Sequence, residues 1–208
     1  MLIWINPSRL TTSGAATIYL VAATEPSSYE FHAKLHALDM STGQDVKPPV
    51  EISLTAQLAD KSVLHFDPQN QWSRARLAYN NGSLYIGIGS HCNNNAYGIT
   101  GWLLRYDTNL VLTKAFNTIF TPHGYELASI WMSGFAPAID AAGNVFMVTG
   151  NGDFTASPAK DWGESVLKLG PALSFKSSFT PYQNGRLNWG DVDFGSGGVM
   201  LLPPVASR

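Results

Sequence analysis

The sequence is poor in cysteine and in charged residues. Its single cysteine, Cys92, excludes an internal disulfide framework. Charged residues make up 13% of the chain, about half the share of an average soluble protein. The formal net charge is −2, from 13 basic and 15 acidic residues, so the chain carries no basic footprint for nucleic acid. We therefore expect no nucleic-acid partner.

Long apolar runs and targeting segments are also missing from the sequence. No stretch of about 18 or more apolar residues occurs, so we expect no membrane-spanning helix. Residues 1–9 lack a basic segment followed by an apolar one, so no signal peptide is visible in this chain.

Glycine and proline are plentiful and spread along the chain. The 208 residues include 19 glycines and 12 prolines, with few helix-forming runs between them. This composition favours many short β-strands over helices. We predict an all-β fold in a single domain, 1–208, with enough chain to bury a core.

The clearest pattern lies in residues 130–154. Residues 131–139 form an apolar segment that we interpret as a strand, and Asp-Ala-Ala-Gly at 140–143 predicts a tight turn. Val145–Val148 is a run of strong β-formers, and Gly150 ends it. The pattern is therefore strand, turn, strand and glycine stop.

The same pattern occurs in residues 77–89. Asn-Asn-Gly at 80–82 predicts a hairpin, because Asn-Gly adopts the positive φ angles of a type I′ turn. Asn81-Gly-Ser83 also matches a glycosylation acceptor, but its place in a tight hairpin favours the turn.

Several spacings agree between these two regions, which indicates an internal repeat. The distance along the sequence from Gly82 to Tyr85 equals that from Gly143 to Phe146. The distance from Leu110 to Phe116 equals that from Leu173 to Phe179. Tyr19, Tyr85 and Phe146 occupy corresponding places in three successive units. Repetition of four-stranded units is typical of a β-propeller.

The repeat divides the chain into about three four-stranded blades. We place them at 1–54, 72–120 and 130–182, with an irregular connection over 55–72, and the start of a next blade at 191–208. Its first strand would be 199–202. Propellers typically have 4 to 8 blades, so we expect either a fragment of a larger propeller or an arc that closes its ring as a homo-oligomer.

Three segments carry a resemblance to a known family. They are Leu-His-Ala-Leu-Asp-Met-Ser-Thr-Gly at 35–43, residues 130–152, and Asp-Val-Asp-Phe-Gly-Ser-Gly-Gly at 191–198. Together they resemble repeats of the quinoprotein-like (PQQ-like) β-propellers of bacteria. The resemblance implies a periplasmic or extracellular protein.

For an active member, the resemblance implies a pyrroloquinoline quinone (PQQ) cofactor and calcium on the propeller axis. The chain departs from that pattern, because the adjacent cysteine pair that caps the cofactor in many alcohol dehydrogenases is missing. No residue matches the family's metal carboxylate, catalytic base or cofactor-floor tryptophan. The catalytic residues are therefore unknown.

Asp191 and Asp193 are the candidate metal ligands. On a strand, residues two apart place both carboxylates on one face, and calcium prefers such oxygen ligands. The alternative is that both side chains cap backbone amides of the glycine-rich turn that follows.

Asn151, Asp153 and Asp161 surround a glycine break and are candidates for the mouth of the propeller. The alternative is that they only stabilise turns. Trp131 and Trp189 lie near glycine-rich segments and could form a stacking platform for a sugar or quinone. The alternative, which we favour for the other tryptophans (Trp4, Trp72, Trp102 and Trp162), is packing between blades.

The histidines and Cys92 give little support for a metal site or a nucleophile. His91 and Cys92 are adjacent, with His123 in another loop, and this spacing fits no zinc site. We expect His32 and His36 to share one strand face at the surface.

The sequence leaves open whether the protein is an enzyme. We favour a non-catalytic propeller that binds a small-molecule or protein ligand, or that serves as a scaffold. The alternative is part of a quinone-dependent alcohol or sugar dehydrogenase.

Overall fold

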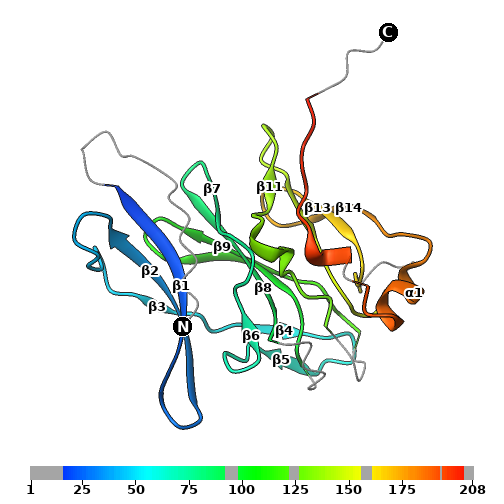
Figure 1. Ribbon diagram of the computed structural model, residues 1–208, viewed down its shortest axis with the longest axis horizontal. Coiled ribbons are helices and arrows are strands. Elements are labelled where there is room, and N and C mark those ends of the chain that lie inside the picture. Colours follow the sequence, from blue (N-terminus) through cyan, green and yellow to red (C-terminus); the bar gives the residue numbers. More distant parts are fainter. Residues whose placement is uncertain (1–15, 92–97, 122–126, 156–160, 193, 204–208) are drawn as a thin grey trace.

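The protein is built mainly of β-strands. The structure is a computed structural model that describes residues 16–91, 98–121, 127–155, 161–192 and 194–203 (Figure 1). Within these residues the chain forms fourteen strands, one α-helix and two short 3-10 helices. The expected all-β class is confirmed.

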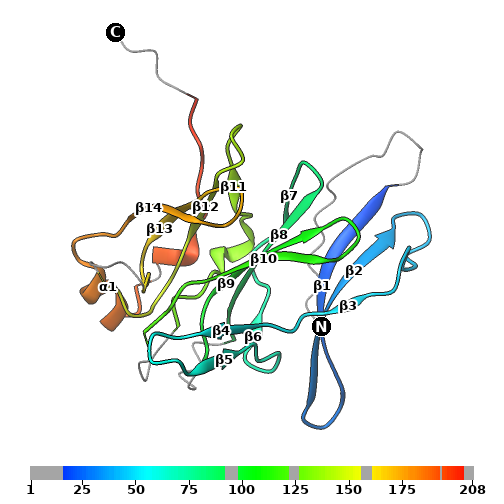
Figure 2. The same cartoon turned by 180° about the vertical axis from the view of Figure 1, so that it is seen from behind.

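The strands form three larger sheets, each antiparallel. The first sheet lies at the left of Figure 1, the middle sheet at the centre and the third sheet at the right, and Figure 2 shows the same order from behind. No sheet among the described residues closes on itself.

The first sheet has the order β1-β2-β3. Its strands are β1 (Thr17–Ser27), β2 (Glu30–Asp39) and β3 (Val50–Glu51). A separate hairpin of β4 (Thr55–Gln57) and β5 (Val63–His65) follows. The prediction of an irregular connection over 55–72 was therefore wrong, because this segment pairs with itself and buries Leu64.

The middle sheet has the order β10-β9-β8-β6, and β7 pairs with the other end of β8. Its strands are β6 (Gln71–Trp72), β7 (Ala78–Asn80), β8 (Ser83–Ser90), β9 (Trp102–Asp107) and β10 (Leu112–Asn117). The predicted hairpin is confirmed, because Asn80 pairs with Ser83 and the φ angles of Asn81 and Gly82 are 45° and 76°.

The third sheet has the order β11-β12-β13-β14. Its strands are β11 (Ala138–Ile139), β12 (Val145–Val148), β13 (Val166–Leu169) and β14 (Phe175–Phe179). The helix α1 (Asn184–Trp189), which the sequence did not predict, comes next.

The sequence predicted strands over 131–139 and over 199–202. The first prediction was wrong in part and the second was wrong throughout. Residues 131–139 form a strand only at their end, because a 3-10 helix, η1 (Met132–Gly134), precedes β11. Residues 199–202 follow a second 3-10 helix, η2 (Phe194–Ser196), and form no strand. A strand needs a partner, and no described residue pairs with this segment.

The internal repeat is visible in the strand register of the middle and third sheets. Tyr85 pairs with Arg105 in the middle sheet, and Phe146 pairs with Lys168 at the corresponding place in the third. Both outer hairpins also shift register at the same point, after Leu112 in β10 and after Phe175 in β14. A β-bulge is a specific local feature, so its recurrence in both sheets supports a true repeat.

The turns of the two outer hairpins also match. Leu110 and Leu173 have φ angles of 63° and 55°, and the side chain of each is buried. The amide of Leu110 donates to the carbonyl of Asp107, and the amide of Leu173 donates to that of Gly170. A left-handed leucine is uncommon, so burial of its side chain must offset the backbone strain.

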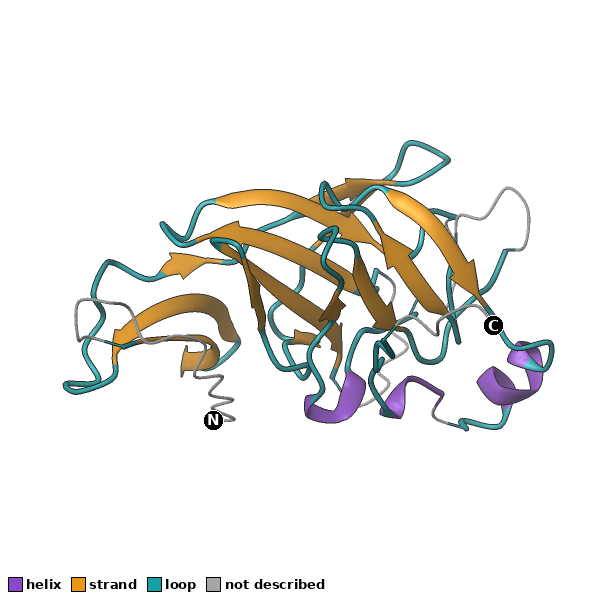
Figure 3. Ribbon diagram, turned by 90° about the horizontal axis from the view of Figure 1, so that it is seen from above, coloured by secondary structure: helices purple, strands orange, loops and turns teal. Residues whose placement is uncertain are grey.

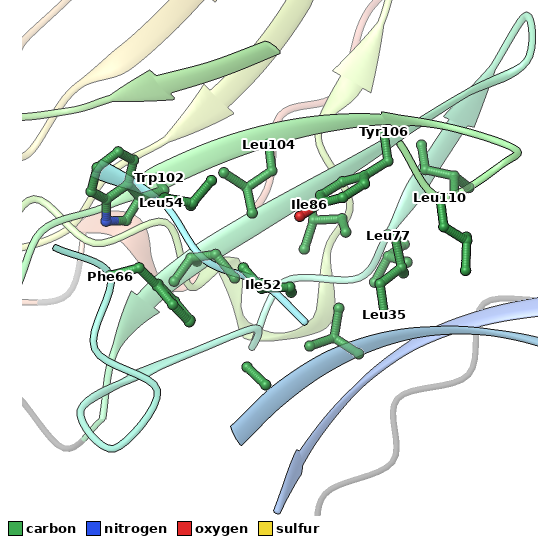
Figure 4. Close-up of a cluster of buried hydrophobic side chains, with 14 of the residues drawn as sticks. Leu35, Ile52, Leu54, Phe66, Leu77, Ile86, Trp102, Leu104, Tyr106 and Leu110 are labelled. Atoms are coloured by element: carbon green, nitrogen blue, oxygen red, sulfur yellow. The ribbon is translucent and has the colours of Figure 1, made fainter. Parts of the chain in front are cut away.

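Two clusters of buried side chains join neighbouring sheets. The first lies between the first and middle sheets and includes Leu35, Ile52, Ile86, Leu104 and Tyr106 (Figure 4). Burial raises the pKa of Tyr106 to about 12. The strand β8 is buried along its whole length, because sheets cover both of its faces.

The second cluster lies between the middle and third sheets. Tyr85, Leu103 and Phe116 of the middle sheet pack in the same cluster as Met147 and Leu167 of the third. Trp102 lies in the first cluster and Trp162 in the second, as expected for tryptophans that pack between sheets.

Candidate functional site

The short helices gather along one side of the molecule (Figure 3). Trp131 precedes η1, Trp189 ends α1, and Asp191 lies between α1 and η2. Three of the predicted site residues therefore lie on the side that carries the helices.

Trp131 is half-buried against the backbone of the loop that follows β12. A Cβ atom at Gly150 would lie 2.8 Å from Nε1 of Trp131, so only glycine allows the indole to lie this close. The guanidinium of Arg74, which is exposed, lies 5.3 Å from the centre of the Trp131 ring. This is a cation–π contact, and it holds a positive charge over the indole.

Asn151 and Asp191 are joined directly, although they lie 40 residues apart. Nδ2 of Asn151 donates to Oδ1 of Asp191 at 2.7 Å, and the amide of Gly152 donates to Oδ1 of Asn188 at 2.9 Å. These bonds attach the loop after β12 to the end of α1. Asp191 has a φ of 50° and lies in a turn.

Trp189 projects from the end of α1. Its side chain is 92% exposed, while the adjacent Asn188 is anchored to Gly152. An exposed indole on an anchored helix end offers a flat apolar surface for a ligand.

Asp153 and Asp161 have structural partners in the same loop region. The carbonyl of Asp153 accepts from the amide of Gly163 at 2.7 Å. Asp161 is fully buried, and its carboxylate accepts from Thr155 and from the amides of Phe120 and Thr121.

The pKa of Asp161 reflects two opposing effects. Burial alone would raise the pKa, but the hydrogen bonds from these threonines and amides together lower it below its ordinary value. Asp161 therefore stabilises the loop as an ionised group, as the turn interpretation predicted.

The described residues do not fit the calcium site suggested for Asp191 and Asp193. Asp191 lies in a turn, so it lacks the strand geometry on which the metal interpretation depended, and Asp193 lies outside the described residues. The Asp191 carboxylate is bonded to the Asn151 amide. Within the described part of the chain, no three His, Cys, Asp or Glu residues lie close enough together to hold a metal ion.

The remaining predicted residues lie elsewhere. His91 stacks on Trp72 with ring centres 3.7 Å apart, while Cys92, His123 and Trp4 lie outside the described residues. His32 and His36 share one face of β2, as expected, and each bonds to acidic side chains.

Sequence reasoning missed Arg74 and Asn188. Arg74 comes from the segment between β6 and β7, and only packing of the middle sheet on the third brings it to Trp131. Asn188 immediately precedes the predicted Trp189, but no sequence spacing indicated its bond to Gly152.

The site combines groups that suit binding. An exposed indole, a guanidinium and an amide–carboxylate pair can stack on a flat apolar face and exchange hydrogen bonds with hydroxyl groups. A sugar presents both kinds of surface.

Comparisons with protein-family models, curated proteins and solved structures found no match for this chain. None of the helices in the described residues is long and apolar enough to cross a membrane.

Proposed function

We propose that this chain is part of a quinoprotein-like β-propeller that binds a ligand without catalysing a reaction. The matched register and bulges of the middle and third sheets support units of the propeller-blade type. The resemblance of residues 35–43, 130–152 and 191–198 to that family supports the class. It also favours an exported protein.

One observation carries the binding role. Trp131 contacts Arg74 on one side and packs against Gly150 on the other. The next residue, Asn151, forms the hydrogen bond to Asp191. Trp189 follows Asn188, which is bonded to the same loop at Gly152. This arrangement places aromatic and polar groups on a loop region tied by several hydrogen bonds, which favours a fixed binding surface.

The ligand class that fits best is a carbohydrate. Sugar rings have an apolar face that stacks on indoles and hydroxyl groups that bond to amides, carboxylates and guanidinium groups. We therefore propose an oligosaccharide that contacts Trp189 and the Arg74–Trp131 pair.

Isothermal titration calorimetry with a panel of neutral and acidic oligosaccharides tests this proposal. Trp189→Ala should weaken binding of the best ligand by about tenfold or more, because it removes a central aromatic contact. Tyr182→Ala is the matched control, because Tyr182 is also fully exposed and precedes α1. It should leave the affinity unchanged.

The proposal fails if no sugar binds, or if the two variants bind alike. Addition of PQQ and calcium with an electron-accepting dye tests the enzymatic alternative. Oxidation of alcohols in that assay, or folding that depends on the metal, would contradict a non-catalytic role.

A further inference from the structure

The middle sheet has one face that the third sheet covers. This Tyr85 face consists of Tyr85, Gly87, Leu103, Arg105 and Phe116, which strand pairing places on one side. Phe116 is only 8% exposed there, and Tyr85 and Leu103 are buried. Gly87 admits the segment before η1, since a Cβ atom at this position would lie 2.8 Å from Cγ2 of Ile130.

The third sheet has the same face, which is open towards β14 but covered at Val148, which is 5% exposed. The corresponding residues, by register, are Phe146, Val148, Val166, Lys168 and Phe179, which we name the Phe146 face. Phe179 occupies the place of Phe116 but is 63% exposed, and every residue of β14 is exposed. Phe146 and Val166 are only half-buried.

The segment that follows α1 resembles the segment that leads into the third sheet. In the third repeat, η1 leads into β11, the first strand of the third sheet. The helix η2 stands in the corresponding position, and residues 199–202 follow it as β11 follows η1. Met200 and Leu202 are 81% and 76% exposed, although their apolar side chains suit a buried strand.

Two polar contacts between neighbouring sheets use corresponding turn carbonyls, although their donors are not at corresponding positions. Nζ of Lys47 donates to the carbonyl of Thr108, in the turn after β9, at 2.7 Å. Nη1 of Arg105 donates to the carbonyl of Pro171, at the matching place after β13, at 2.9 Å. Lys168 holds the position of Arg105 in the third sheet, but its ammonium lies over the Phe146 ring at 5.4 Å.

We propose that the Phe146 face docks a fourth sheet of the same repeat, and that residues 199–202, which form no strand here, become its first strand once that sheet is present to pair with them. Its packing face would be aliphatic, like Val145, Met147, Leu167 and Leu169, which pack against the Tyr85 face. Lys168 would then donate to the turn carbonyl of the new sheet. The interface between the middle and third sheets is the template, and the proposal is independent of the sugar site.

A second copy of the chain is a poorer occupant. The outward face of the first sheet carries His32, Lys34 and His36, since the alternate residues of β2 lie in the first core cluster. These polar groups would lose solvent against an apolar surface. Two copies docked through their Phe146 faces would bring two Lys168 side chains together, which like-charge repulsion opposes.

An extended chain tests the proposal. Residues 141–190 are appended after Leu202, so that 199–202 precede a copy of the third sheet. We expect the extended chain to be monomeric and to unfold about 5 °C or more above the 208-residue chain. Hydrogen exchange in β14 and at 199–202 should slow by about tenfold or more.

The matched control carries aspartate in place of the appended copies of Met147 and Leu167. It should show none of these changes, because its packing face is charged. For the 208-residue chain, Phe179→Ser should lower the binding of anilinonaphthalene sulfonate (ANS), which tests whether the Phe146 face is an exposed apolar surface.

Three results would overturn the proposal. The first is an extended chain that gains neither hydrogen-exchange protection nor thermal stability. The second is an aspartate control that gains as much as the extended chain. The third is a discrete dimer of the 208-residue chain in which hydrogen exchange in β14 is slowed. The last result would assign the face to a second copy. Sugar binding is measured separately, so its failure leaves these outcomes unchanged.

Discussion

The middle and third sheets share a repeat but differ in how much of it is buried. Phe116 and Phe179 occupy matching positions on the outer strands, yet one is 8% exposed and the other 63%. Leu110 and Leu173, in contrast, are both buried in matching turns. Contacts within a unit therefore recur with the sequence, whereas contacts between units depend on the neighbouring sheet.

The largest expected effect contrasts the two phenylalanines. Phe116→Ala should lower the free energy of unfolding by about 3–5 kcal/mol, because it leaves a cavity between two sheets. Phe179→Ala should change it by less than about 0.5 kcal/mol, because the side chain is mostly in water. Chemical denaturation measures both values. Equal losses would contradict the difference in burial between the two faces.

The next effect concerns the close approach at Gly87, where the third sheet has Val148. Gly87→Val should cost about 1–3 kcal/mol or more, because the new side chain would overlap Ile130 and Ala75. Gly185→Ala is the control. Its Cβ atom would meet nothing within 4 Å, and alanine in a helix should stabilise the protein by up to about 1 kcal/mol. Thermal unfolding followed by circular dichroism distinguishes the two directions.

A smaller effect separates Arg105 from Lys168. Arg105→Gln should cost about 1 kcal/mol, because it removes hydrogen bonds to Ser83 and to the carbonyl of Pro171. Lys168→Gln removes a contact over the Phe146 ring and a weak surface attraction to Asp140, and it should cost about half as much or less. Urea unfolding of the two variants is the measurement, and a larger loss for Lys168→Gln would contradict it.

The smallest expected effect is a dependence of stability on pH that arises in the first sheet. The open face of the first sheet is polar, whereas the open face of the third sheet is largely apolar. Hydrogen bonds that the His32 ring donates to Glu30 and then to Glu51 raise the pKa of His32. A raised pKa in the folded state means that the charged form stabilises the fold. This stabilisation is fully present below the ordinary histidine pKa of about 6.5 and is lost as the pH rises through the raised value.

The titration of His32 is measured by NMR, and thermal unfolding is compared at about pH 5.5 and pH 8.5. His32→Gln should reduce the change in stability between these two pH values. A His32 pKa at or below the ordinary value would contradict the expected pairing with the two glutamates.

Local features were predictable from the sequence because their causes are local. The Asn81-Gly82 hairpin follows from the φ angles that these two residues adopt. The strand Val145–Val148 follows from its β-forming side chains. Trp131 and Asn151 were candidates from the sequence because each lies near a glycine-rich segment, and the structure places both at the loop after β12.

The rest of the candidate site could not be predicted, because it depends on packing between segments that are distant in sequence. The contact of Arg74 with Trp131 requires the middle and third sheets to meet. The bond from Asn151 to Asp191 requires α1, which its weak helical sequence did not reveal. The metal interpretation of Asp191 was conditional on a strand, and the structure places this residue in a turn.

The sequence by itself determined an all-β chain, its hairpin turns and the spacing of its repeat, since strand propensity and turn geometry act over a few residues. The tertiary structure decided which face of each sheet is buried. Burial depends on whether an apolar surface meets another one, and the Phe146 face has the same pattern as the Tyr85 face without the neighbour that would cover it.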